Sequence, residues 1–183
     1  SGEPLPEPMN MIQIAAKKVL EDLGRPSLKS ENWKYTSTRW IEDNVWEISS
    51  PKNSYSFDDL NIEEKANQLI FVDGVFQSEL SNAPLEGIEI KPLEEGLRTE
   101  DTSLEEKEFF PLMNKAFLKE GICIEVEGQF SRDDVFDFIF LWSKRSFAKA
   151  AFTKTILKLF KNASLWVKET HRDLESEKEE KGS

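Results

Sequence analysis

Residues 69–76 read Leu-Ile-Phe-Val-Asp-Gly-Val-Phe, and they carry the clearest structural signal in the chain. Two apolar, β-prone runs flank an Asp-Gly pair, which is the preferred pair for a two-residue hairpin turn. We therefore predict an antiparallel hairpin that turns at Asp73 and Gly74. Strand and helix patterns both occur around this hairpin, so the expected fold class is α+β.

Three further stretches have strand character. Residues 88–91 alternate apolar and polar side chains, which is typical of a half-buried strand. In a strand over residues 122–127, Ile122, Ile124 and Val126 would lie on one face and Cys123 on the other. Residues 135–142 are β-branched or aromatic apart from Asp137 and Leu141, which favours a strand covered on both faces.

Two stretches have helical character. Residues 11–23 repeat apolar side chains at helical spacing, and Gly24 supplies the expected helix end. A second helix is predicted to begin near Phe110, because Pro111 is tolerated only in a first turn, and to end at Gly121. A short helix is also expected within residues 57–67, with Asp58 or Asn61 as its capping residue.

The segment 147–167 is ambiguous. Its apolar side chains keep helical spacing, so periodicity alone predicts one long helix. The same segment contains strand formers such as Thr153, Thr155 and Val167, and a Lys161-Asn162 pair that suits a turn. The residues by themselves leave both alternatives open.

The composition excludes several function classes. The 183 residues carry a net charge of −11, which disfavours nonspecific binding to nucleic acid, and no apolar run reaches the roughly 18 residues of a membrane span. One cysteine and one histidine exclude an internal disulfide and a His-rich metal site. This composition leads us to expect a cytoplasmic protein.

No catalytic motif is present. The chain lacks a glycine-rich phosphate loop and a Gly-x-Ser-x-Gly nucleophile motif, and its one Cys/His pair, Cys123 and His171, has no ligand spacing. We expect Cys123 to be an inert side chain and His171 to be solvated. Paired acids are common only because acids are common; they are Asp58-Asp59, Glu63-Glu64 and Asp133-Asp134 with Asp137. The sequence therefore predicts no catalytic, cofactor-binding or metal-binding residue and no enzyme.

Charge is unevenly distributed along the chain. Residues 142–172 contain eight basic residues and one acidic residue, so the remainder is more acidic than the total implies. One interpretation is that the lysines solvate the outer face of a packed element. The other is that this segment, which is also aromatic, binds an acidic partner or an anionic membrane surface.

Four segments, in their order along the chain, resemble a known family. They are residues 25–36, which contain Trp33-Lys34-Tyr35, residues 69–76 followed by Leu80-Ser81, residues 113–126, and residues 158–171. Together they resemble the SufB/SufD family of iron–sulfur cluster assembly proteins, and are most similar to the N-terminal part of SufD. The role of Trp33, Lys34 and Tyr35 in the family motif is unknown.

The resemblance implies an architecture. It implies that residues 10–121 form an α+β region that is helical and mixed in character, and that residues 122–172 form the first turns of a β-helix, a truncated solenoid. The residues themselves lead us to expect a disordered N-terminus over 1–9, which holds three prolines, and a charged tail over 173–183. The resemblance also favours strands from 153 to 170, with a turn at Lys161-Asn162, over the long helix.

The resemblance further implies a non-catalytic component of an iron–sulfur cluster assembly machine, as an N-terminal fragment or a truncated form. SufB-like and SufC-like proteins would be the partners of a full-length protein. The family's cluster-handling residues and partner interfaces have no matching position in this chain, so no cofactor is assigned to it. The alternative is a stand-alone interaction module that docks an acidic partner through the aromatic and basic segments. Because a solenoid with few turns exposes a strand edge, we expect that edge either to form a homodimer or to be covered by a refolded C-terminal segment.

Overall fold

The computed structural model describes residues 7–24, 37, 39–42, 46–48, 54–83, 85–97, 108–143 and 149–174. The helices in these ranges are α1 (Glu7–Leu23), α2 (Arg39–Glu42), α3 (Phe57–Leu60), the 3₁₀ turn η2 (Ser78–Leu80), α4 (Leu93–Gly96) and α5 (Phe109–Phe117). The strands are β1 (Glu47–Ile48), β2 (Gln68–Val72), β3 (Val75–Phe76), β4 (Ile88–Pro92), β5 (Glu120–Val126), β6 (Phe136–Trp142), β7 (Lys149–Ala150), β8 (Thr153–Leu159) and β9 (Val167–Asp173). The predicted α+β class is confirmed.

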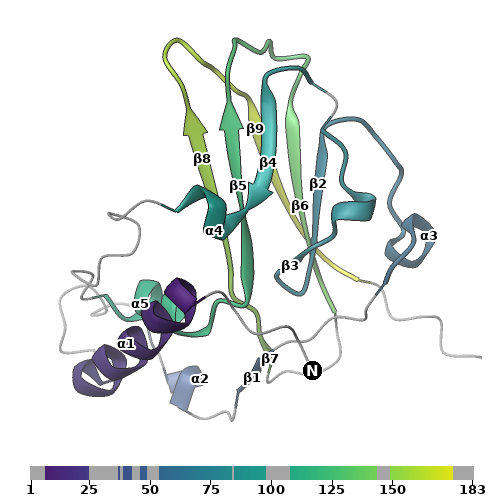
Figure 1. The fold of residues 1–183 in the computed structure, drawn as a ribbon. Coiled ribbons are helices and arrows are strands. Elements are labelled where there is room, and N and C mark those ends of the chain that lie inside the picture. Colours follow the sequence, from purple (N-terminus) through teal and green to yellow (C-terminus); the bar gives the residue numbers. More distant parts are fainter. Residues whose placement is uncertain are drawn as a thin grey trace, which may run out of the picture.

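Most of the strands form two sheets that pack against each other (Figure 1). Sheet I has the order β3-β2-β6-β9, and sheet II has the order β4-β5-β8. The pairs β2–β3 and β4–β5 are antiparallel, whereas β2–β6, β6–β9 and β5–β8 are parallel. The short strands β1 and β7 form a separate parallel pair.

From residue 120 onward, the four long strands alternate between the two sheets, with the short strand β7 outside both. The chain runs through β5 in sheet II, β6 in sheet I, β8 in sheet II and β9 in sheet I. Pairing joins Gly121 to Lys154 and Phe136 to Val167, which lie 33 and 31 positions later. The connecting segments follow the same register, because Gln129 bridges to Ser164 in parallel. β8 and β9 therefore lie beside β5 and β6, the strands that precede them by one circuit of the two sheets.

The main core lies between the sheets. It is formed by the facing rows of β2, β5 and β6: Leu69, Phe71, Ile122, Ile124, Val126, Phe136, Phe138 and Phe140. Each of these side chains is at least nine-tenths buried. Burial of so many large apolar side chains is the principal stabilising contribution to a fold of this size.

Aromatic rings stack across sheet I because its parallel strands are in register. Phe71, Phe140 and His171 occupy paired positions on β2, β6 and β9. The Phe71 and Phe140 ring centroids are 4.7 Å apart, and those of Phe140 and His171 are 4.8 Å apart, with interplanar angles of 16° and 11°. These separations match the spacing of neighbouring strands, so the rings form one ladder across three strands.

The outer faces of both sheets are covered in part. On sheet I, Ile70, Val72, Ile139 and Leu141 pack against Leu60 of α3. On sheet II, Met9 of α1, Leu93 of α4 and Leu118, after α5, enclose a smaller cluster that Ile156 of β8 contacts. Figure 1 shows α4 beside β5 and β8, α1 and α5 packed together near the lower end of sheet II, and α3 beside sheet I. No helix in the described ranges is long and apolar enough to cross a membrane.

The predicted hairpin is confirmed. Asp73 and Gly74 connect β2 to β3 with φ values of 49° and 82°, the left-handed conformation that a type I′ turn requires. The predicted strands are present as β4, β5 and β6. The ambiguous segment forms β8 and β9, and Asn162 has a φ of 65° in the turn between them. The long helix predicted from periodicity alone is therefore wrong.

Several predicted boundaries are wrong. α1 begins at Glu7 rather than at residue 11. The N-cap of α3 is Ser56, which forms a capping box with Asp59, and Asn61 is the left-handed residue that ends the helix. α5 ends at Phe117, and Gly121 lies within β5, where a Cβ would meet the Lys154 carbonyl on β8. Close packing between these two strands, rather than a helix end, accounts for this glycine.

Phe140 is the central ring of the aromatic ladder, stacked on both Phe71 and His171. We expect Phe140→Ala to lower the free energy of unfolding by about 3–5 kcal/mol, because it leaves a cavity between two stacked rings. Urea denaturation followed by tryptophan fluorescence measures this loss. Phe160→Ala is the matched control, since this ring is 43% exposed and its removal should cost about 1 kcal/mol or less. Equal losses for the two variants would contradict the role given to the ladder.

Candidate functional site

The family motif at Trp33, Lys34 and Tyr35 lies outside the described residues, as does the whole of residues 25–36. The structure therefore does not test its role. Residues 1–6 and 175–183, at the two predicted ends, also lie outside the described ranges.

Cys123 and His171 are not brought together. Cys123 is fully buried on β5, on the face opposite Ile122 and Ile124, and it packs directly against Gly96 of α4. His171 lies on β9 and stacks on Phe140, so its ring belongs to sheet I. A thiol enclosed by α4 and an imidazole on the other sheet do not form a nucleophile and base.

His171 has a defined hydrogen-bonding state. Trp142 Nε1–H donates to His171 Nδ1 at 3.3 Å, so Nδ1 must be the unprotonated acceptor. The proton then resides on Nε2, which contacts Glu169 Oε1 at 2.5 Å. This arrangement orients the imidazole at the end of the aromatic ladder, and the prediction of a merely solvated histidine is incomplete.

Two of the paired acids singled out in the sequence, Asp59 and Asp134, have local structural roles. Asp59 Oδ2 accepts from the Ser56 backbone N–H at 2.8 Å and caps α3. Asp134 Oδ2 accepts from the hydroxyl and backbone N–H of Ser131, at 2.7 and 3.1 Å. Both carboxylates therefore stabilise turns, as short polar side chains commonly do.

Asp137 connects β6 to β9 on the outer face of sheet I. Its two oxygens accept from Lys168 Nζ and Thr170 Oγ1, each at 3.0 Å. Further along β9, Arg172 donates to the backbone carbonyls of Leu60 and Asn61 at 2.9 and 3.0 Å. The two cations on this face of β9 are therefore already engaged within the protein.

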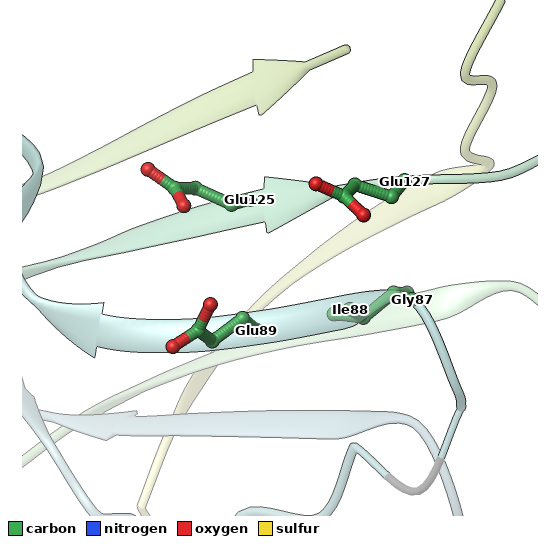
Figure 2. A pocket seen from close by; sticks show the side chains of 5 residues that line it. All are labelled: Gly87, Ile88, Glu89, Glu125 and Glu127. Atoms are coloured by element: carbon green, nitrogen blue, oxygen red, sulfur yellow. The ribbon is translucent and has the colours of Figure 1, made fainter.

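An acidic hollow on sheet II was not singled out by the sequence. It has a volume of about 250 Å³ and is lined by Gly87, Ile88, Glu89, Glu125 and Glu127. Figure 2 shows the carboxylates of Glu89 and Glu125 projecting from the neighbouring strands β4 and β5, with Glu127 at the end of β5. Glu89 and Glu125 are directly paired across the two strands, and such a like-charge pair is destabilising unless a cation offsets it.

Two lysines, Lys91 and Lys158, offset the repulsion between these glutamates. Lys91 Nζ lies 2.7 Å from Glu125 Oε2 and 3.0 Å from Glu89 Oε2. Its hydrogen bond to Glu125, then that to Glu89, raises the pKa of the Lys91 ammonium. Lys158 Nζ lies 3.8 Å from the other Glu125 oxygen and donates to the Gly96 carbonyl. The hollow therefore holds an ion-pair network that joins β4, β5 and β8, and its carboxylates are not arranged as a general acid and base.

No group of three or more His, Cys, Asp or Glu side chains in the described part of the chain has the arrangement of a metal site. The alternating pattern of residues 88–91 and 122–127 predicts which glutamates face outward. It does not predict which of them meet, because that depends on the register of β4 with β5.

A second feature is the open end, defined as the exposed apolar side chains of β8, β9 and their connection. These side chains are between 38% and 47% exposed, and they are Leu157, Leu159, Phe160, Trp166 and Val167. Arg132, from the connection between β5 and β6, stacks over Trp166 with its guanidinium carbon 4.4 Å from the ring centroid. Exposed aromatic and arginine side chains next to apolar ones are characteristic of protein interfaces.

Glu120 is positioned between the two sheets. It belongs to β5 in sheet II, and its Oε1 accepts from the Phe76 backbone N–H of β3 in sheet I at 3.1 Å. Partial burial raises the pKa of the Glu120 carboxyl, although the Phe76 hydrogen bond acts in the opposite direction. The folded protein therefore holds the proton on this carboxyl more tightly than the unfolded chain does.

This difference predicts a pH dependence. As pH rises from the ordinary carboxyl range through the raised pKa of Glu120, wild-type stability falls, because ionisation costs more in the folded state. Glu120→Gln keeps an oxygen acceptor for Phe76 and removes this cost. We expect the variant to gain less than about 1 kcal/mol over wild type near pH 7, and the gain to disappear near pH 4.

Urea denaturation of both proteins at the two pH values measures the difference. Glu127→Gln is the matched control, because Glu127 directly follows the same strand and is exposed. A Glu120→Gln protein that is destabilised more at pH 7 than at pH 4 would show that the hydrogen bond from Phe76 to the ionised carboxylate outweighs the cost of burial.

The sequence matches no protein-family model and no curated protein. A function is therefore inferred from the residues of this chain and from their arrangement.

Proposed function

We propose that this chain is the N-terminal part, or a truncated form, of a SufD-like protein of iron–sulfur cluster assembly. It acts as a non-catalytic component of the assembly machine in the cytoplasm. SufB-like and SufC-like proteins are the partners proposed for the full-length protein. The chain itself is proposed to bind no cofactor, and the cluster is the cargo of the complete machine.

The observation that carries the proposal is the path of the chain through the two sheets. The strands β5, β6, β8 and β9 alternate between sheets, and the later two add in parallel to the earlier two. The connections also pair, since Phe130 N–H donates to the Ser164 carbonyl and Ser164 N–H donates to the Gly128 carbonyl. Stacked circuits of this kind support the first turns of a β-helix, which the family resemblance implies.

The arrangement of polar groups supports a non-catalytic role. Glu89 and Glu125 of the acidic hollow share Lys91, and Asp59 and Asp134 stabilise turns. Cys123 is enclosed beneath α4. A component that positions other subunits requires a rigid framework rather than a reactive group, and these interactions provide rigidity.

The second candidate function is a stand-alone interaction module for an acidic partner. The open end favours it, because apolar and aromatic side chains are exposed there within a basic segment. Such a patch is a candidate docking surface on a chain whose remaining sequence is acidic.

Disruption of the gene in its natural host tests the first function. We expect the activity of aconitase, an iron–sulfur enzyme, to fall, whereas malate dehydrogenase, which has no cluster, stays unchanged. Return of the wild-type gene should restore aconitase. Return of a gene with Trp33→Ala and Tyr35→Ala should restore it less, because these residues carry the most specific part of the resemblance.

Lys65→Ala is the matched control for the restoration, since Lys65 is an exposed side chain that pairs with Glu63, two positions away. Protein levels are compared by immunoblot, so that loss of the protein is not mistaken for loss of function. Unchanged aconitase activity in the disrupted strain would refute the SufD-like function.

A further inference from the structure

Two strand edges lie at the open end, and neither is paired with another strand of the described ranges. β8 is the last strand of sheet II and β9 is the last strand of sheet I, and no strand in the described ranges pairs with their outer edges. An unpaired edge presents backbone N–H and C=O groups that can hydrogen-bond an added strand. The two edges differ in their side chains, and this difference identifies the edge that is suited to an added strand.

On β9, polar side chains face the space between the two sheets. Glu169 and His171 are paired with Phe138 and Phe140, so they occupy the inner row of sheet I. Their side chains are 58% and 51% exposed and contact each other. An apolar strand added here would cover these polar groups at a desolvation cost.

The β8 edge is apolar on the same inner side. Leu157 and Leu159 are paired with Ile124 and Val126, so they extend the inner row of the main core. They are 38% and 47% exposed, and a strand added beside β8 would bury them. Apolar side chains at alternate positions of that strand would continue the core by one more row.

The surroundings of the β8 edge are basic. Residues 153–174 contain five basic and two acidic residues. Lys154 and Lys158 lie on the outer face of β8, and Lys161 lies in the turn that follows it. An added strand with acidic side chains at its outward positions would meet these lysines, whereas a second copy of this chain would bring its own lysines against them.

We propose that the edge of β8 binds an extended segment of an acidic partner protein, in which apolar residues alternate with glutamate or aspartate. The apolar residues pack on Leu157 and Leu159, and the carboxylates face Lys154 and Lys161. Trp166, held by Arg132, borders the site at the connection after β8. This inference deepens the second candidate function and is independent of the first.

The test uses the full chain and a fluorescein-labelled, end-capped heptapeptide of sequence Glu-Val-Glu-Val-Glu-Val-Glu. Fluorescence anisotropy measures its dissociation constant, which we expect to lie below about 1 mM. A Lys-Val-Lys-Val-Lys-Val-Lys peptide should bind at least about tenfold more weakly, because it repels the lysines. A version of the acidic peptide with proline in place of its central valine should also bind weakly, because proline removes an edge hydrogen-bond donor.

Two pairs of variants locate the site. Leu159→Asp should weaken binding of the acidic peptide roughly tenfold or more, and Ile14→Asp, at an exposed position on α1, should leave it unchanged. Lys154→Glu combined with Lys161→Glu should weaken it similarly, whereas Lys65→Glu, before β2, should not. Circular dichroism and urea denaturation establish that each variant is folded.

Three outcomes overturn the inference. Failure of the acidic peptide to bind a monomeric chain removes both the inference and the docking function. Equal binding of the proline peptide leaves docking of an acidic partner in place but eliminates strand addition. Analytical ultracentrifugation could instead show that the chain is a dimer and that Leu159→Asp dissociates it. That result would mean that the β8 edge binds a second copy of the chain. Aconitase activity in the disrupted strain reports separately on the SufD-like function.

Discussion

The structure depends on the in-register stacking of β2, β6 and β9, with β6 in the centre. Phe71, Phe140 and His171 can form a ladder only if the three strands are parallel and unshifted, since a slip of one residue would turn Phe140 to the opposite face. On that face Ile139 and Leu141 pack under α3, so a slip would also disrupt the second cluster. The ladder thus fixes the register of sheet I, and the core between the sheets positions β5 against it.

Local signals in the sequence predict part of this arrangement. The hairpin was predictable because Asp73 and Gly74 must adopt positive φ values that few other pairs tolerate, and β6 was predictable because both of its faces are apolar. The segment of β8 and β9 was not predictable from periodicity, because Leu159, Ala163 and Trp166 keep helical spacing although they belong to a strand and a turn. The pairing of β8 with β5 overrides that spacing, since it extends both the inner and the outer face of an existing sheet.

The candidate sites were less predictable than the strands, because they depend on which strands meet. The alternating patterns place Glu89 and Glu125 outward, but only the pairing of β4 with β5 sets them opposite each other and brings Lys91 between them. The same holds for Lys158, which reaches Glu125 because β8 adds beside β5. The ion-pair network therefore depends on the register between strands that are far apart in the sequence. The local pattern of each strand does not predict that register.

The two sheets end differently, and this asymmetry determines what can cover the open end. On β9, His171 accepts a hydrogen bond from Trp142 of β6 and contacts Glu169 through its other ring nitrogen, so the inner row of sheet I ends in a satisfied polar group. On β8, Leu157 and Leu159 continue an apolar row that remains exposed. A complete further circuit would have to cover both rows and would bury the polar group, whereas a single strand beside β8 covers only the apolar row. The geometry therefore favours addition of one strand to one sheet over face-to-face association of the whole end.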